Sequence, residues 1–526
     1  MASVVDIRPA VPLIDLVDAL DGVGVRRFIG ASGSDESLVP GAVSVRGVTV
    51  SSEDCDDEWA FVAIGGLVRH GARFSGAARR AGANVVVTDE AGAGEAHTAS
   101  GGLPVVVVDD PRAAAAVISA NVYRHPASRL TTMGVTGTNG KTTTSYLMRA
   151  ALRARFADPA LCGTIETRIG DLSFLSSRTT AEAPVVQRFL ALADEKGLGA
   201  AVVEASSHAV SLHRIDGAVL DVVGFTNLQH DHLDYYGDME TYFEAKKGLF
   251  TPERALRGVV CVDDEWGRRL AVESRIPVAT VSALTDEPAD WMVRDTHPDP
   301  AIGRTVFTLV DPRGQGRPVA MPILGDVNVQ NTALAIVSAV QIGLDVDEAI
   351  RAVEAADQIP GRMEKVNPSP GDEPLVIVDY AHTPEALEWT LRSTRELTRG
   401  RLVIVFGTDG DRDASKREHL AQVAARGADV LWVTDENPRT EDPQRIRDAL
   451  MRGVASQRPG LEGVVEIVTS RRDAVRKAIL AAGAGDTVIV TGKGAEWYQE
   501  VEGVKHAYND VDVAREVLAC APLARM

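Results

Sequence analysis

The sequence predicts an α/β protein with three domains, and two features of its 526 residues carry this prediction. From Leu130 onward, short apolar runs alternate with helical patterns, which is typical of βαβ units and of parallel sheets. Two segments separate regions of different pattern: one lies around His125 and Pro126, and the other, Ile359–Pro370, is rich in Pro and Gly. We therefore expect domains at residues 1–125, 126–360 and 361–526.

The first domain is expected to be α/β, because it is rich in Ala, Gly and Val and contains strand-like runs at Val85–Asp89 and Val105–Asp110. The central domain is expected to add a small antiparallel part to its parallel sheet. Arg304–Val310 and Pro318–Leu324 flank a turn rich in Gly and Pro, and this pattern predicts a hairpin.

Composition excludes several classes of protein. Lys and Arg number 55 and Asp and Glu number 74, so the net charge is −19, which is unsuited to binding a nucleic-acid backbone. No apolar stretch reaches the roughly 18 to 20 residues that span a bilayer, and Asp15 and Asp18 interrupt the first apolar segment. The four cysteines, which form no CxxC pair and so exclude a zinc ribbon, are Cys55, Cys162, Cys261 and Cys520. We expect a cytoplasmic protein that is not embedded in a membrane.

Candidate chemistry lies where the predicted strands end. In open α/β sheets, ligands bind outside the carboxyl ends of the strands. A polar, charged or Gly-rich cluster follows each of the main apolar runs, which end at Val135, Val203, Phe225, Val378, Phe406, Val433 and Val490.

The first of these clusters resembles a phosphate-binding loop. Glycines would let backbone N–H groups surround phosphate oxygens at a helix N-terminus, a lysine would add charge, and a hydroxyl would be available to Mg²⁺. The strict GxxxxGK[ST] pattern is not met, because Val135 occupies its first glycine position. The alternative is a Gly-rich turn without a ligand. The loop residues are Thr136, Gly137, Thr138, Asn139, Gly140, Lys141 and Thr142.

Two further clusters supply residues suited to a nucleotide-bound Mg²⁺. Glu204 follows one predicted strand and His232 follows the next, and a helix carrying Lys246 comes after them. Carboxylate oxygen and imidazole can serve as ligands near the phosphates of a nucleotide. Each residue alone is more often a solvated carboxylate, a structural histidine or an exposed lysine, but together they support an enzyme that uses a nucleoside triphosphate.

At this point the sequence resembles a known family. Its motifs occur in the order found in the Mur ligases, and the resemblance is strongest to the UDP-N-acetylmuramoyl-tripeptide synthetase (MurE) type. The motifs are TGTNGKT, VEASSH, TNLQHDHLDYYGDME, GRME, VDYAHTPEALE, GDRD, NPRTEDP and GKG. The resemblance covers roughly residues 125–526. It implies a UDP-substrate domain, a central ATP-binding domain with a P-loop-type parallel sheet, and a Rossmann-like C-terminal domain.

The resemblance also implies an activity. Such an enzyme is an ADP-forming ligase that adds a diamino acid to the D-Glu of UDP-N-acetylmuramoyl-L-Ala-D-Glu through an acyl phosphate. The step belongs to peptidoglycan synthesis and so serves the cell wall, cell shape and cell division. ATP and Mg²⁺ are the implied cofactors. The implied catalytic residues are Lys141, Glu204, His232 and a carbamylated Lys246, and the implied metal ligands are Thr142, Glu204, His232 and Lys246.

Further site residues are carried over from the family motifs. Besides the phosphate loop, the expected ATP contacts are Asn328, with Asn331 nearby, Arg362 and Asp379. The expected contacts to the UDP substrate are Ser52, Thr179, Thr180, Ser206 and Arg214. The expected contacts to the incoming amino acid are Arg412, Glu436, Asn437, Pro438, Arg439, Gly492 and Glu496.

Several positions depart from the family motifs. Ser51-Ser52-Glu53 stands where the family has Asp-Ser-Arg, so the contacts to uridine are open. Asp409, Glu436 and Ala495 also differ from the common motifs. Arg439 favours meso-diaminopimelate, because its planar fork suits a second carboxylate. The added acidic residues instead suit a diamino acid with one carboxylate, such as lysine or ornithine, and this class stays open.

Two other functions are compatible with parts of the pattern. One is a sibling enzyme, either another Mur ligase or a folylpolyglutamate-type ligase. The roughly 125 residues before the phosphate loop argue against the folate enzyme. The other is an inactive regulatory relative, which the intact Lys141, Thr142, Glu204, His232 and Lys246 make less favourable.

Overall fold

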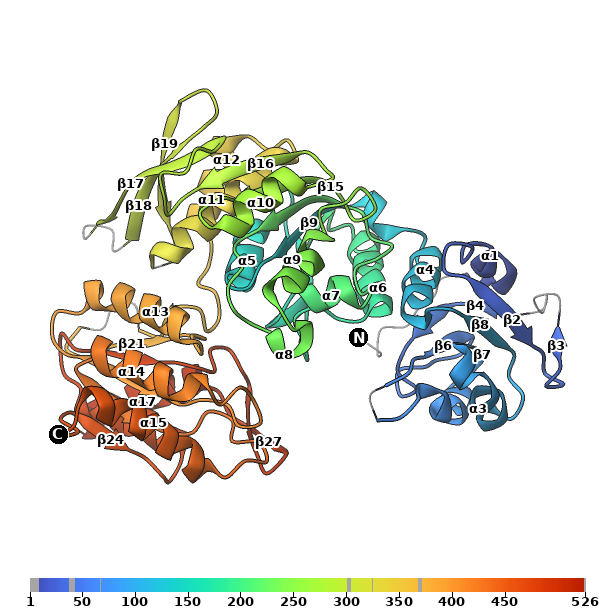
Figure 1. Cartoon of the computed structure of the whole chain (residues 1–526). Coiled ribbons are helices and arrows are strands. Elements are labelled where there is room, and N and C mark those ends of the chain that lie inside the picture. Colours follow the sequence, from blue (N-terminus) through green and yellow to red (C-terminus); the bar gives the residue numbers. More distant parts are fainter. Residues whose placement is uncertain are drawn as a thin grey trace. The chain divides into compact units, whose positions relative to one another are not determined.

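The computed structural model describes residues 9–36, 43–66, 68–299, 304–323, 325–367 and 371–524. The chain forms two compact units. Figure 1 labels the helices and strands along the chain. The first comprises Met1–Arg294, Leu309–Arg317 and Gln330–Val353, and the second comprises Asp295–Thr308, Pro318–Val329 and Glu354–Met526. The predicted boundary between residues 125 and 126 falls inside the first unit and stays a prediction.

The N-terminal part of the first unit contains a six-stranded sheet in the order β3-β2-β8-β7-β6-β5. Strands β5 to β8 are parallel, whereas β2 and β3 are antiparallel to their neighbours. The runs predicted at Val85–Asp89 and Val105–Asp110 are confirmed as strands β7 and β8. The sheet strands are β2 (Val25–Ile29), β3 (Asp35–Glu36), β5 (Gly47–Thr49), β6 (Trp59–Ala63), β7 (Ala83–Thr88) and β8 (Val105–Val108).

Short elements complete this part of the chain. Strands β1 (Val11–Pro12) and β4 (Ser44–Val45) pair with each other. Asp110 caps the helix that follows β8 by accepting hydrogen bonds from the N–H groups of Arg112 and Ala113. The helices are α1 (Leu13–Asp18), α2 (Ser75–Arg80), α3 (Glu90–Ser100) and α4 (Pro111–Val122).

The central sheet has eleven strands in the order β12-β11-β10-β13-β9-β14-β15-β16-β17-β18-β19. The strands from β10 to β17 in this order are parallel, and β11 and β12 form an antiparallel edge. The sheet strands are β9 (Thr131–Thr136), β10 (Ala160–Cys162), β11 (Glu166–Ile169), β12 (Leu172–Leu175), β13 (Ala200–Glu204), β14 (Leu220–Phe225), β15 (Ala255–Cys261), β16 (Val278–Ser282), β17 (Trp291–Asp299), β18 (Arg304–Val310) and β19 (Gly316–Met321).

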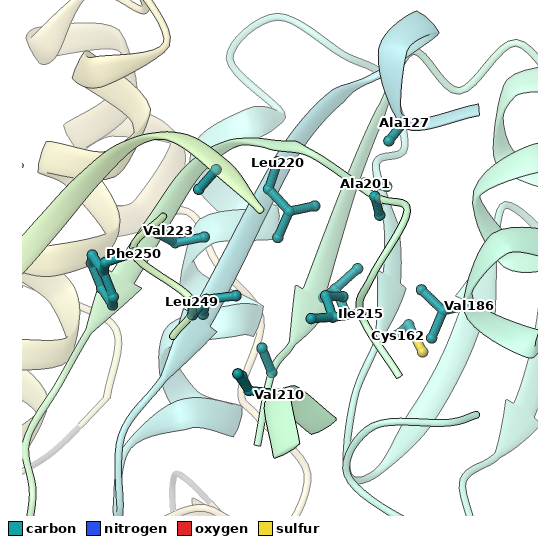
Figure 2. Close-up of a cluster of buried hydrophobic side chains, with 14 of the residues drawn as sticks. Ala127, Cys162, Val186, Ala201, Val210, Ile215, Leu220, Val223, Leu249 and Phe250 are labelled. Atoms are coloured by element: carbon teal, nitrogen blue, oxygen red, sulfur yellow. The ribbon is translucent and has the colours of Figure 1, made fainter. Parts of the chain in front are cut away.

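A core of buried apolar side chains packs against this sheet, and Figure 2 shows part of it. Val186 of α6 and Leu220 of β14 belong to this core, together with Phe250, which follows α9. The helices of this region are α5 (Lys141–Leu152), α6 (Ala183–Glu195), α7 (Ser207–Ser211), α8 (Leu233–Tyr236), α9 (Met239–Lys247), α10 (Glu265–Glu273), α11 (Asp326–Gln341) and α12 (Val346–Glu354).

The predicted hairpin is confirmed. Strands β18 and β19 are neighbours, and between them the N–H of Gly314 donates to the carbonyl of Asp311 at 2.8 Å. A five-residue connection can only join antiparallel strands. Leu324, at the end of the predicted second strand, lies outside the described residues, as do residues 368–370 of the second predicted boundary.

The second unit contains a six-stranded sheet in the order β20-β21-β25-β22-β23-β24. All of its strands are parallel except the edge strand β20 (Glu364–Lys365). The parallel strands are β21 (Leu375–Val378), β22 (Leu402–Phe406), β23 (Val430–Val433), β24 (Val464–Glu466) and β25 (Thr487–Val490). A two-stranded hairpin of β26 (Tyr498–Val501) and β27 (Val504–Ala507) follows.

Helices of the second unit pack in two groups. Helix α14 (Lys416–Gly427) contacts α13 (Pro384–Leu397) and α15 (Pro443–Gln457), whereas α16 (Arg471–Ala481) contacts α17 (Asp510–Ala524). A parallel sheet combined with these helices is the α/β architecture expected for this part of the chain.

The predicted strand ends agree with the structure. Each of the seven apolar runs ends within one residue of the end of a strand: β9, β13, β14, β21, β22, β23 and β25. The four cysteines are all unpaired thiols, and two of them, Cys162 and Cys261, are buried. Across the described residues, no helix is long and apolar enough to cross a membrane.

Candidate active site

The predicted phosphate loop joins β9 to α5, and its backbone requires glycine. Gly137 and Gly140 have φ values of +146° and +87°. A Cβ atom on Gly137 would overlap the hydroxyl of Thr226, and one on Gly140 would overlap the side chain of Asn331. The loop thus brings its backbone into close approach with the end of β14 and with helix α11.

Residues after β14 hold the loop in place. Thr226 donates its hydroxyl to the carbonyl of Asn139 at 2.6 Å, and the Asn227 side chain accepts from the N–H of Asn139 at 3.1 Å. Lys141 begins α5, and its ammonium donates to the carbonyls of Gly137 and Thr138, both at 2.9 Å. No pattern in the sequence indicated this role for Thr226.

Glu204 is completely buried at the end of β13 and is surrounded by donors. Its carboxylate accepts from the hydroxyls of Thr142 at 3.0 Å and Ser145 at 3.1 Å. Thr164 donates its N–H at 3.1 Å and its hydroxyl at 2.8 Å. Thr142 and Glu204, two of the predicted metal ligands, therefore lie within hydrogen-bonding distance of each other. Ser145 lies one helical turn after Thr142, so its spacing was the one signal that could have revealed it.

Lys246, on α9, is 1% exposed and lies against the phosphate loop. Its Nζ donates to the carbonyl of Gly137 at 2.8 Å and lies 4.5 Å from the ring centre of Tyr242. Burial, and then the charge of Lys141, hold the pKa of Lys246 well below its usual value. Burial therefore disfavours the charged form of this amine, in contrast to an exposed lysine.

His232 precedes α8 with a φ of +54°. Burial lowers the pKa of His232, the neighbouring Asp231 raises it, and the charges of Lys141 and Lys246 lower it further. The His232 ring centre lies 6.0 Å from that of Tyr242, the ring that the Lys246 ammonium also approaches. The structure therefore brings the predicted catalytic residues Lys141, His232 and Lys246 together, and Glu204 reaches them through Thr142.

In the part of the chain that is described, no group of three or more His, Cys, Asp or Glu side chains could hold a metal ion. The predicted ligands nevertheless suit Mg²⁺ in kind, because Glu204 and Thr142 offer oxygen atoms. A lysine converted to a carbamate would add further oxygen atoms at the buried end of Lys246.

A cavity of about 520 Å³ lies in the first unit. Its walls come from the N-terminal sheet and from the segment that includes β12 and the start of α6. The guanidinium of Arg188 lies 5.2 Å from the ring centre of Trp59 on its wall. Polar side chains that line it include Thr49, Ser51, Ser177, Arg178, Glu182 and Arg188. Ser51 lines it, whereas its neighbour Ser52, the predicted contact, does not.

The other residues predicted to contact the UDP substrate form a connected group beside this cavity. Thr180 donates to the carbonyl of Glu204 at 2.6 Å and accepts from the N–H of Ser206 at 3.0 Å. Thr179 accepts from the hydroxyl of Thr164 at 3.1 Å. Arg214 lies 3.2 Å from Glu182, a residue of the cavity wall. This network couples the cavity wall to the carboxylate beside the phosphate loop.

The residues predicted to contact ATP, which come from helix α11 and from the second unit, have partners within the protein. Asn331 accepts from the hydroxyl of Thr144 at 3.2 Å, whereas the N–H of Asn328 donates to Gly325 at 2.9 Å. The guanidinium of Arg362 lies 4.3 Å from the ring centre of Tyr380. Asp379 accepts from the N–H of Met363 at 3.0 Å and from the Thr390 hydroxyl at 2.8 Å.

In the second unit, most residues predicted to bind the amino acid form one polar cluster. We call it the Arg439 cluster, and it consists of Asp409, Glu436, Asn437, Arg439, Gly492, Lys493, Glu496 and Glu500. Asn437 donates to Asp409 at 3.0 Å and to Glu496 at 3.1 Å. The ammonium of Lys493 donates to Asn437 at 2.8 Å and to Glu496 at 2.6 Å.

Two residues predicted to bind the amino acid, Arg412 and Pro438, are not part of the Arg439 cluster. Among the described residues, no hydrogen bond or ion pair joins the exposed Arg412 to the Arg439 cluster. Pro438 is buried, and a Cβ on Gly410 would overlap its carbonyl. Sequence reasoning missed Lys493 and Glu500, although Lys493 lies inside the GKG motif.

Two family models match separate stretches of the chain. Residues 135–339 match the Mur ligase middle domain, and residues 361–494 match the Mur ligase, glutamate ligase domain. A UDP-N-acetylmuramoyl-L-alanyl-D-glutamate–2,6-diaminopimelate ligase from Streptomyces coelicolor is 41% identical over 97% of this chain and 96% of its own. A UDP-N-acetylmuramyl-tripeptide synthetase from Leifsonia xyli is 44% identical over 96% of both chains.

Solved structures of Mur ligases are also similar to this chain. The structure of a UDP-N-acetylmuramoyl-L-alanyl-D-glutamate–2,6-diaminopimelate ligase has a TM-score of 0.64 and 30% identity, covering 94% of this chain and 99% of its own. MurF from Acinetobacter baumannii shares the fold, with a TM-score of 0.64 at 17% identity, covering 92% of this chain and 96% of its own. With relatives that match over nearly its full length, the chain belongs to the Mur ligase family of ATP-dependent, ADP-forming ligases.

Proposed function

We propose that this chain adds a diamino acid to the D-Glu of UDP-N-acetylmuramoyl-L-Ala-D-Glu in the cytoplasm, as a step of peptidoglycan synthesis. Support comes from the names of the relatives, which join this dipeptide substrate to 2,6-diaminopimelate or refer to its tripeptide product. We assign residues 1–125 to the UDP substrate, 126–360 to ATP and 361–526 to the amino acid. The cavity walled by Ser51 and Arg178 would take the UDP end.

One observation carries the proposal. The phosphate loop, the buried Glu204 and the buried Lys246 meet at one place, where hydrogen bonds connect Thr142 to Glu204 and Lys246 to Gly137. A structural lysine is rarely buried without a carboxylate partner. Here a buried amine lies against a loop whose shape suits a triphosphate.

The reaction has two steps. The γ-carboxylate oxygen of the D-Glu attacks the γ-phosphorus of ATP, ADP leaves, and an acyl phosphate forms. The neutral amine of the incoming amino acid then attacks the acyl carbon, phosphate leaves with the bonding electrons, and the nitrogen loses a proton. Lys141 and the N–H groups of the loop would neutralise charge on the transferring phosphoryl group, which is where most catalysis of such a step lies.

Mg²⁺ would be held by Thr142, Glu204, His232 and a carbamylated Lys246, and it would supply positive charge beside the phosphates. Carbamylation requires a neutral amine, and the burial that lowers the pKa of Lys246 favours that form. The modification turns a buried base into an anion and so removes the repulsion that a lysine ammonium would exert on the metal.

The test is ADP release by the purified protein. We expect release only when ATP, the UDP-dipeptide and a diamino acid are present together. Release with a folate and glutamate would favour a folylpolyglutamate-type enzyme. The absence of release with any pair, from a protein shown to be folded by circular dichroism, would indicate an inactive relative.

A further inference from the structure

Two of the three guanidinium nitrogens of Arg439 already face carboxylates of its own chain, whereas its buried Nε has no hydrogen-bond partner among the described residues. Its Nη2 lies 2.9 Å from Asp409, and its Nη1 lies 3.4 Å from Glu500. Its backbone N–H also donates to the carbonyl of Glu500 at 3.0 Å, which fixes the residue beside strand β26. Both ends of the guanidinium fork therefore face carboxylate oxygens that belong to the protein.

Asp409 is held against Arg439 by contacts from two sides. One of its oxygens pairs with Arg439, and the other accepts a hydrogen bond from Asn437 at 3.0 Å. An Arg fork and an amide N–H are the groups that recognise a carboxylate. A second carboxylate on the substrate would have to displace Asp409 or approach it at close range.

Carboxyl groups outnumber cationic side chains in the Arg439 cluster. Its four carboxyl groups, Asp409, Glu436, Glu496 and Glu500, are accompanied by two cationic side chains, Arg439 and Lys493. The guanidinium of Arg471 also acts on Glu436, but it forms an ion pair with Asp510.

Glu436 provides a second, independent sign of a ligand. It is 4% exposed, and its Oε2 has no hydrogen-bond partner within the ranges that the structure describes. The glycine at position 492 keeps a side chain away from this oxygen, because a Cβ there would overlap it. A buried carboxyl oxygen without a donor is costly, and a substrate ammonium would satisfy it.

We propose that the incoming amino acid is a diamino acid with a single carboxylate, of the lysine and ornithine class, and that Asp409 excludes meso-diaminopimelate by occupying Arg439. The inference rests on the ligase function proposed above. It reverses the preference that the presence of Arg439 suggested from the sequence. The Leifsonia xyli relative, at 44% identity, is named for its tripeptide product without a particular amino acid.

The experiment compares kcat/KM for lysine, ornithine and meso-diaminopimelate with the full chain, ATP and the UDP-dipeptide. We expect at least a tenfold preference for lysine or ornithine. Asp409→Gly should free Arg439 and shift the ratio toward meso-diaminopimelate by tenfold or more. Glu502→Gln, which removes an exposed carboxylate from the same hairpin as Glu500, should leave the ratio unchanged.

Equal or better turnover of meso-diaminopimelate by the unaltered protein would overturn the inference, as would an unchanged ratio in a folded Asp409→Gly variant. If no amino acid supports ADP release, the ligase function itself fails. Calorimetric titration of each amino acid into the full chain, with an ATP analogue and the UDP-dipeptide present, then still decides the inference: tighter binding of lysine or ornithine supports it, and tighter binding of meso-diaminopimelate contradicts it.

Discussion

The ion pair between Arg471 and Asp510 should stabilise both the second unit and its polar cluster. Both side chains are 0% exposed. Arg471 donates to Asp510 at 3.0 and 2.8 Å, and the Tyr508 hydroxyl donates to the same carboxylate at 2.7 Å. Arg471 also donates to the carbonyl of Thr491 at 2.7 Å, just before Gly492 of the Arg439 cluster.

Asp510→Asn removes the negative charge and keeps the shape. Breaking a buried pair by removing one partner costs about 3–5 kcal/mol, because the remaining charge is buried without compensation. Asn keeps one acceptor oxygen, so we expect a loss near the lower value. Because Arg471 positions the segment before Gly492, the KM for the amino acid should rise as well.

Hydrogen-exchange mass spectrometry of peptides from α16 and α17 would report the free energy of opening of this part of the chain. The matched control is Glu516→Gln, which breaks the pair of Arg472 and Glu516 between the same two helices. Their side chains are 54% and 61% exposed, so the change should stay within about 0.5 kcal/mol. A loss below about 1 kcal/mol for Asp510→Asn would refute the energetic argument.

Three further predictions concern the phosphate loop with its neighbour Lys246, and the Arg439 cluster. Lys141→Ala should lower kcat by about 10³-fold or more in a folded protein, because a charge that binds the phosphates is lost. Near-normal turnover of this variant would show that the loop does not bind phosphate as assigned. Lys246→Ala should abolish ligation, and Lys246→Glu should restore part of the activity. Carbamylation would be contradicted if intact-mass analysis and a high-resolution map show a bare amine in a fully active protein. Burial, and then the charge of Asp409, raise the pKa of Glu436 to about 8 from an ordinary 4.5. The folded state then holds a proton that the unfolded chain releases, so stability should fall as the pH rises between these values. Glu436→Gln should remove this loss of stability. If the melting temperature changes equally between about pH 5 and pH 8 in the variant and in the unaltered protein, the prediction is wrong.

The local pattern of the sequence was enough to locate the ends of seven strands and the glycine-rich turn between β9 and α5. A buried strand reads as an apolar run, and a glycine-rich turn followed by Lys141 and Thr142 marks the start of a helix. These signals depend on neighbours in the chain, so the ends of β9, β13 and β14 could be predicted to within a residue. The motifs likewise indicated the family, because their order along the chain is a property of the sequence.

Only the tertiary structure decided which side chains share a partner. Thr164 donates to Glu204 and Thr226 holds Asn139, but each pair is separated by many residues, and a lone threonine carries no pattern. Arg439 looked from the sequence like a free fork for a substrate carboxylate, and folding places Asp409 against it. The physical reason is that the partner of a buried polar group is set by the way strands and helices bring distant segments together, and burial makes that pairing obligatory.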